Sequence, residues 1–192
     1  MDSHFSHNYG VMNSDNKPYK PDILCKIKNS IIYMGPAPGK NKVSHANKNI
    51  HSRDFTTDFQ EIKKLNISHI FCLLEDHEFN KNGLGNYPTI VKENGLTISH
   101  YSIIDQNIPS LELMHEMVLN LHDCINQEKN VLIHCMGGVG RTGTLASCFL
   151  VYCNYNPQEA ILITQKQRKG TIKRESQQHF VTEYQKYLSK IK

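Results

Sequence analysis

Cys135 and Arg141 stand six positions apart in a glycine-rich stretch, and this pairing suits chemistry on an anion. In a tight loop between a strand and a helix, successive backbone N–H groups converge and form a cradle for a phosphate. Arg141 can grip two phosphate oxygens in a fork. The same positive field lowers the pKa of a thiol from about 8.5 into the range of about 3.5–7.5. The spacing therefore predicts phosphoryl transfer to the Cys135 sulfur. The expected phosphate-binding residues are Met136, Gly137, Gly138, Val139, Gly140 and Arg141.

The residues next to this loop have predicted supporting roles. His134 precedes the cysteine, and its ring can hydrogen-bond backbone and hold the loop. Thr142 follows the arginine, and its hydroxyl can stabilise the sulfur when it leaves phosphorus. Both are therefore included among the catalytic residues that the sequence predicts.

Asp105 is the predicted acid that protonates the departing oxygen. It follows an apolar run and lies in a polar turn that ends at Pro109. Because the carboxyl ends of parallel strands share one edge of a sheet, Asp105 and Cys135 are expected to face the same crevice. The alternative is that Asp105 only caps the helix that begins near Ser110, although Ser110 or Asn107 would cap it as well.

These residues need a scaffold of strands alternating with helices. Apolar runs predict strands within 23–34, over 67–74, 96–104 and 131–134, and helical spacing predicts helices over 54–65, 87–93, 111–127, 142–152, 157–167 and 175–190. Residues 40–53 and 75–86 are expected to be polar loops. The order predicts a three-layer α/β domain with a central, mainly parallel sheet.

Length and composition fit one domain. Residues 1–20 are polar and aperiodic and are expected to be a flexible arm, leaving 21–192 as the catalytic domain. The net charge of +4 is too weak to indicate a nucleic-acid partner. No apolar run approaches the ~18 residues of a membrane span, and no secretory signal opens the chain. Six cysteines without a Cys-x-x-Cys pair favour reduced thiols in the cytoplasm. No metal or other cofactor is expected, and the oligomeric state stays open.

The stretch from His134 to Thr142 resembles the Cys-x5-Arg-Ser/Thr loop of the protein tyrosine and dual-specificity phosphatase superfamily. Ala37-Pro38-Gly39-Lys40, the helix from Asp58 and the paired glycines of the loop look most like its kinase-associated phosphatase branch. The resemblance implies the tyrosine phosphatase fold, with catalysis by Cys135, Arg141 and Asp105. No Trp-Pro precedes Asp105, unlike in receptor-type members.

Two further site residues are side predictions. By resemblance, Gln177 is the candidate for positioning water, with Gln178 close behind. Cys72 ends a strand and could form a reversible disulfide with Cys135, although a buried inert thiol is the alternative. One of Glu75, Asp76 and Glu78 could brace Arg141. Basic residues between Lys166 and Arg174 could form a rim for an acidic phosphopeptide or an inositol headgroup, or simply a solvated face.

Three functions remain open from the sequence. The first is a phosphoprotein phosphatase that hydrolyses phosphotyrosine, and phosphoserine or phosphothreonine as further substrates, through a phosphocysteine; its partner would be a phosphorylated protein such as a protein kinase. The second is a phosphoinositide or RNA 5′-triphosphate phosphatase, against which the apolar Met136 and Val139 inside the loop argue. The third is a non-catalytic phospho-binding module, but the chain keeps Cys135, Arg141 and Asp105.

Overall fold

Five strands form the main sheet, in the order β2-β3-β8-β6-β7. The computed structural model describes residues 10–44 and 49–191. The strands are β2 (Asp22–Ile27), β3 (Ser30–Gly35), β6 (Ile67–Cys72), β7 (Thr97–His100) and β8 (Asn130–His134). β2 is antiparallel to β3, and the other pairs are parallel. The parallel strands therefore end at one edge, and Cys135 follows the central strand there.

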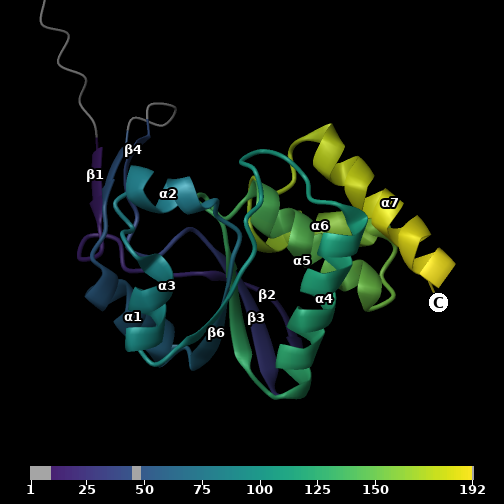
Figure 1. Cartoon of the computed structure of the whole chain (residues 1–192), viewed down its shortest axis with the longest axis horizontal. Helices are drawn as coiled ribbons and strands as arrows, with labels where there is room; N and C mark the ends of the chain where they lie inside the picture. The colour runs from purple at the N-terminus through teal and green to yellow at the C-terminus, as the bar shows by residue number, and fades with distance from the viewer. Residues whose placement is uncertain (1–9, 45–48, 192) are drawn as a thin grey trace, which may run out of the picture.

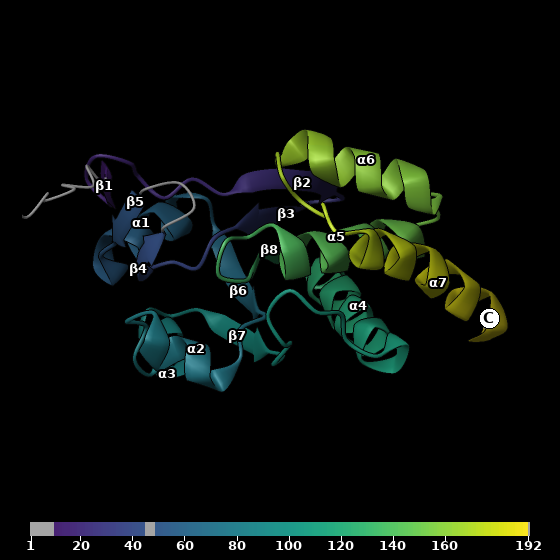
Figure 2. The ribbon, with the colours of Figure 1, turned by 90° about the horizontal axis from the view of Figure 1, so that it is seen from above.

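Helices cover both faces of this sheet and give the predicted three layers (Figures 1 and 2). On one side lie α1 (Phe55–Lys64), α2 (Asp76–Lys81) and α3 (Tyr87–Glu93). On the other lie α4 (Leu111–Asn126), α5 (Gly140–Tyr152), α6 (Pro157–Gln167) and α7 (Glu175–Ile191). The α5 helix is buried from Arg141 to Val151, which explains why its second half, from Leu145 onward, is almost entirely apolar. The expected mainly parallel α/β architecture is confirmed.

Local capping sets several of the predicted helix starts. The Asp54 carboxylate accepts the N–H of Thr57 at 2.8 Å and begins α1. The Ser110 hydroxyl accepts the N–H of Leu113 at 3.2 Å and begins α4. Since Ser110 caps α4, Asp105 does not serve as that cap.

Two predicted loops contain regular structure. Residues 75–86 include α2, whose first turn is fixed when the Glu78 carboxylate accepts the N–H of Glu75 at 2.9 Å. Residues 40–53 include β4 (Asn41–Ser44) and β5 (Asn49–Ser52), with residues 45–48 outside the described part. These short polar strands lack the apolar alternation that reveals a strand in a sequence, so the loop predictions were wrong there.

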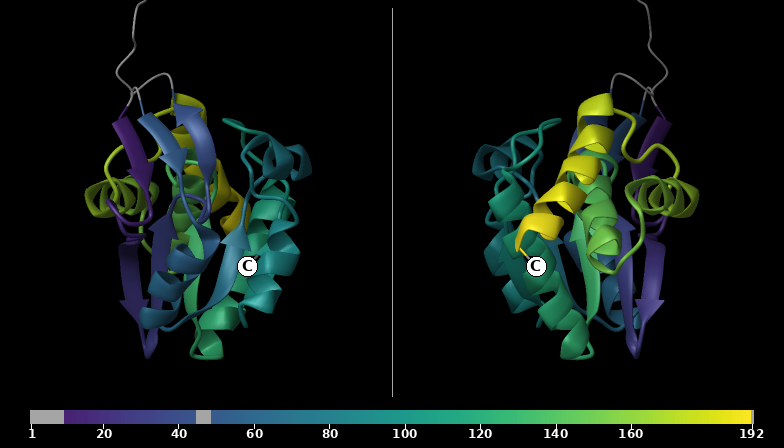
Figure 3. Two further views of the ribbon diagram at one scale, coloured as in Figure 1. Left: turned by 90° about the vertical axis from the view of Figure 1, so that its left-hand side faces the viewer. Right: turned by 90° about the vertical axis from the view of Figure 1, so that its right-hand side faces the viewer.

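The predicted N-terminal arm differs from the structure over residues 10–20. β1 (Gly10–Asn13) pairs with β5, and the small sheet β1-β5-β4 stands beyond one end of the main sheet (Figure 3). Tyr19 is buried, and its hydroxyl donates to the carbonyl of Pro36 at 2.7 Å. The Ser14 hydroxyl donates to Asp58 at 2.8 Å. These contacts hold residues 10–20 against the domain, while residues 1–9 lie outside the described residues.

Of the helices within 10–44 and 49–191, none has the length and apolar character that a bilayer crossing requires.

Candidate active site

The carbonyl groups of the loop after β8 all point outward. Those of Met136 and Val139 accept N–H groups of Ala37 and Ile172, each at 3.3 Å. Those of Gly137 and Gly138 accept from the Arg168 guanidinium at 2.9 and 2.6 Å. With four successive carbonyls held from outside, the loop N–H groups are left to face its interior. This is the geometry of an anion-binding nest.

Gly138 is required for this loop path. Its φ is +67°, a left-handed conformation that favours glycine. A β-carbon there would also collide with the backbone of Gly35 and Pro36. The second glycine of the pair therefore lets the loop lie directly against the end of β3.

Cys135 lies at the base of the nest and is 3% exposed. Burial raises the pKa of its thiol, but the Arg141 charge and hydrogen bonds from Thr142 and the backbone of Val139 outweigh burial and leave the pKa below its ordinary value. The Thr142 hydroxyl is itself buried and has no nitrogen or oxygen partner among the described residues. Its proton is therefore free to serve the Cys135 sulfur.

The Arg141 side chain is fixed by α2 and by two carbonyls. Its Nη1 and Nη2 atoms donate to the Glu78 carboxylate at 2.5 and 3.0 Å. Nη1 also donates to the carbonyls of Leu73 and Ile103 at 3.0 and 2.8 Å. Of the three acidic residues that the sequence offered as a brace, Glu78 contacts Arg141.

Asp105 faces the same cavity as Cys135. Its carboxylate accepts from Arg141 Nη2 at 2.9 Å, and its side chain is 54% exposed. The turn is held when the Asp105 N–H donates to Glu75 at 3.0 Å and Arg174 donates to the Gln106 side chain. The cavity has a volume of about 380 Å³ and is also lined by Lys173 and Gln177. An exposed carboxyl beside a fixed guanidinium can move without unfolding its surroundings.

His134 is buried, and its two ring nitrogens have different partners. Nδ1 lies 3.3 Å from the carbonyl of Cys135, which can only accept, so Nδ1 carries the proton. Nε2 then accepts from the Tyr87 hydroxyl at 3.0 Å. Burial lowers the pKa of His134 to about 3, so the ring is neutral at physiological pH. His134 thus ties the Cys135 backbone to α3.

The comparison with protein families decides the membership of this chain. The family model described as "Polymorphic toxin system, DSP-PTPase phosphatase" matches residues 45–154, which include β6, β8 and the whole Cys135 loop. The chain belongs to this phosphatase family. Cysteine-dependent phosphatase chemistry is accordingly the class of activity that this chain, with its Cys135 loop, supports.

Curated relatives and solved structures agree with this membership. The rat cyclin-dependent kinase inhibitor 3 is 28% identical over 140 residues, 71% of this chain and 66% of that protein, so the match spans slightly under two thirds of the relative. The zebrafish protein tyrosine phosphatase domain-containing protein 1 is 29% identical over 109 residues, 56% of this chain and 15% of that protein. The structure of kinase associated phosphatase with its catalytic-site cysteine replaced by serine has a TM-score of 0.80 at 23% identity, covering 90% of this chain and 97% of that one.

Gln177, which the family resemblance suggested, lies against Gly140 and lines the Cys135 cavity. It is 1% exposed, and its amide nitrogen has no hydrogen-bond partner among the described residues. Gln178 instead donates to the carbonyl of Ile172 at 2.8 Å. The geometry therefore favours Gln177 over Gln178, while its role in positioning water stays a prediction.

Cys72 is fully buried at the end of β6, in register with His134. Burial raises its thiol pKa to about 12. All six cysteines are free thiols. The reversible disulfide between Cys72 and Cys135 stays a prediction.

Arg168 is the supporting residue that sequence reasoning missed. It was grouped with a basic rim, but it contacts the outward carbonyls of the loop and pairs with Asp22 at 2.5 Å. Of the other rim residues, Lys173 and Arg174 reach the Cys135 cavity. Because Arg168 lies 27 positions after Arg141 in sequence, no local pattern could have connected it with the loop.

Proposed function

We propose that this chain is a phosphoprotein phosphatase that hydrolyses phosphotyrosine, and phosphoserine or phosphothreonine as further substrates, through a phosphocysteine on Cys135. The observation that carries the proposal is a thiol of lowered pKa at the base of a loop whose four carbonyls point outward. Such a site binds a phosphate dianion and presents a thiolate to its phosphorus.

In the first step, the Cys135 sulfur attacks phosphorus while the bond from phosphorus to the ester oxygen breaks. The loop N–H groups, from Met136 to Gly140, and Arg141 would hold the non-bridging oxygens. Because Glu78 and two carbonyls occupy Nη1, and Glu78 also takes one N–H of Nη2, the Nε N–H and the other Nη2 N–H of Arg141 remain to form the fork. Asp105, released from Nη2 by the incoming phosphate, would in its protonated form donate to the leaving oxygen.

In the second step, water attacks the phosphocysteine and the bond from sulfur to phosphorus breaks. Asp105, now a carboxylate, would take the proton from water. The unpartnered amide of Gln177 would orient that water. The Thr142 hydroxyl would donate to the departing sulfur, and inorganic phosphate would leave the loop.

The proposed substrate is a phosphorylated protein, and a protein kinase is a candidate because one similar structure is that of a kinase associated phosphatase. The catalytic domain that we propose begins within the segment that packs through Ser14 and Tyr19 rather than after residue 20. Six free cysteines, one of them the proposed nucleophile with a lowered pKa, favour action in a reducing compartment such as the cytoplasm.

Asp105→Asn tests the acid role. We expect kcat on a phosphotyrosine peptide to fall about 10²-fold or more, the usual contribution of a positioned acid. On an aryl phosphate whose leaving group departs without protonation, kcat should fall much less. Steady-state rates on both substrates measure the difference.

Asp76→Asn is the matched control, because Asp76 is 85% exposed and the same charge is removed near the site. It should keep nearly full activity. Equal losses on both substrates in Asp105→Asn would exclude the acid role. A soluble inositol phosphate tested beside the peptides separates the phosphoinositide alternative: hydrolysis of that compound without hydrolysis of peptides would contradict the proposed substrate class.

A further inference from the structure

A second cavity lies beside the Cys135 cavity. It has a volume of about 480 Å³, and Gly137 and Val139 line both cavities. The two spaces therefore adjoin at the rim of the phosphate-binding loop, formed by Gly137 and Val139. A substrate seated at Cys135 can reach the second cavity over that rim.

Cations dominate the lining of this second cavity. Its charged lining residues are Lys17, Lys20, Lys40, Arg53 and Arg168, and no Asp or Glu is among its described lining residues. Two of these five cations already have carboxylate partners. Arg53 binds Asp58 at 2.6 and 2.7 Å, and Arg168 binds Asp22 at 2.5 Å. Lys17, Lys20 and Lys40 have no ion pair with a described residue.

Lys40 is held in place by the fold. It is only 9% exposed, and the preceding Gly39 donates its N–H to Asp58 at 2.9 Å. Burial and, to a smaller extent, the nearby charge of Lys42 lower the pKa of Lys40 to about 8, while Cys135 acts in the opposite direction. A buried ammonium without a carboxylate partner is costly, and a bound anion would relieve that cost.

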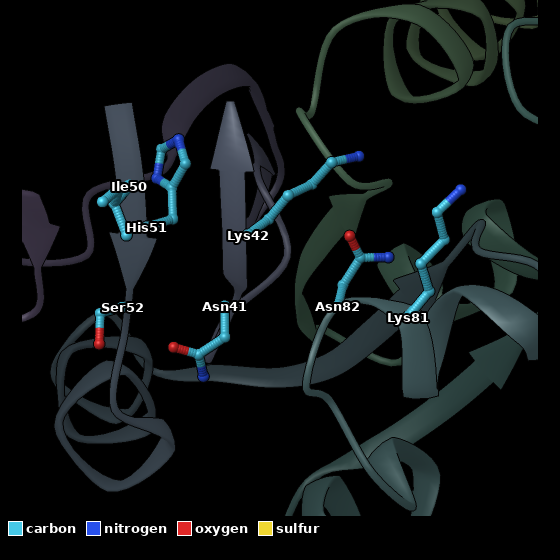
Figure 4. A pocket seen from close by; sticks show the side chains of 7 residues that line it. All are labelled: Asn41, Lys42, Ile50, His51, Ser52, Lys81 and Asn82. Carbon is cyan, nitrogen blue, oxygen red and sulfur yellow. The ribbon is translucent and has the colours of Figure 1, made fainter. Parts of the chain in front are cut away.

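The basic lining continues away from Cys135. His51 also lines a neighbouring hollow of about 460 Å³, to which Lys42 of β4 and Lys81 at the end of α2 contribute (Figure 4). Figure 4 shows the side chain of Asn82 between those of Lys42 and Lys81. Successive basic hollows suit an extended phosphopeptide, whose phosphates are spread along a chain. They suit an inositol phosphate less, because its phosphates cluster around one ring.

We propose that the Lys40 cavity, formed by Lys17, Lys20, Lys40 and the rim of the loop, binds a second phosphate on the peptide whose first phosphate lies at Cys135. The proposal rests on the proposed phosphatase function and narrows its substrates to multiply phosphorylated peptides. Lys40 supplies the buried charge, and Lys17 and Lys20 are exposed at the mouth of the cavity.

The test measures binding to the full chain carrying Cys135→Ser, so that substrate is not consumed. The probes are peptides with one phosphotyrosine and, at successive positions on either side, either phosphoserine or serine. At one spacing we expect the doubly phosphorylated peptide to bind about tenfold more tightly, the gain of a charge-assisted hydrogen bond to a partly buried cation. Adding Lys40→Met should reduce that gain to less than about twofold. Lys26→Met, an exposed lysine on β2, should leave it unchanged.

Lys17→Ala with Lys20→Ala is the second variant, since both side chains are exposed and their loss should not disturb the fold. It should reduce the gain at the same spacing. Equal affinity of singly and doubly phosphorylated peptides at every spacing would overturn the second site. The second site would also be overturned if the doubly phosphorylated peptide still bound more tightly by the same factor in Lys40→Met and in the Lys17→Ala, Lys20→Ala variant. Wild-type chain that hydrolyses neither singly nor doubly phosphorylated peptides would instead overturn the proposed function.

Discussion

Cys135→Ser is expected to abolish turnover, with kcat on a phosphotyrosine peptide falling at least about 10⁴-fold. A serine hydroxyl at this position stays protonated near neutral pH, and the field of Arg141 that lowers the thiol pKa does not suffice to ionise it. Steady-state and single-turnover kinetics measure the loss.

The same variant should still bind phosphopeptide, because the outward carbonyls of residues 136–139 and the Arg141 side chain do not depend on the sulfur. Calorimetric titration and thermal unfolding therefore accompany the kinetics. Retention of more than about a tenth of the activity by a folded Cys135→Ser variant would refute nucleophilic catalysis by Cys135.

Arg141→Lys is expected to reduce kcat/KM at least about 10³-fold, although it keeps the positive charge. A lysine cannot offer a planar fork to phosphate, nor reach Glu78, Leu73 and Ile103 together as Arg141 does. The loss should appear mainly in kcat, since the fork matters most when charge develops on the transferring group.

Glu78→Gln separates positioning from direct contact with substrate. It removes the charge that holds Arg141 at 2.5 Å but leaves the guanidinium itself. We expect an intermediate loss of about tenfold in kcat/KM, with the loss in Asp76→Asn near zero. If Glu78→Gln and Arg141→Lys reduced kcat/KM equally, loss of the forked contact with phosphate would not explain the effect of Arg141→Lys.

The fold was predictable wherever burial imposes a period or a cap marks a boundary. Asp54, Ser110 and the apolar face of α4 located their helices correctly. The small sheet was not predictable, because its strands are short and polar and gain their stability from pairing with each other. The α2 helix was missed since its start depends on the Glu78 carboxylate turning back to Glu75, in a stretch that reads as a charged loop.

At the site, the sequence identified the residues of the loop but not its supports. That Cys135, Arg141 and Asp105 lie together could be predicted, because the ends of parallel strands meet at one edge of the sheet, while their catalytic roles stay predictions. Arg168 and Lys40 come from distant segments, and only the packing of α6 and of the segment after β3 brings them to Gly137. A half-buried arginine that acts on backbone carbonyls leaves no local signature in a sequence.

The central claim is a phosphocysteine on Cys135, and rapid acid quench with a radiolabelled phosphopeptide tests it most directly. Wild type and Gln177→Ala are mixed with substrate, quenched within the first turnover and digested, and the labelled fragment is identified by mass spectrometry. We predict label on the fragment containing Cys135, more of it in Gln177→Ala, and none in Cys135→Ser. Release of phosphate with no label on Cys135 at any time, or with label on another residue, would contradict the account.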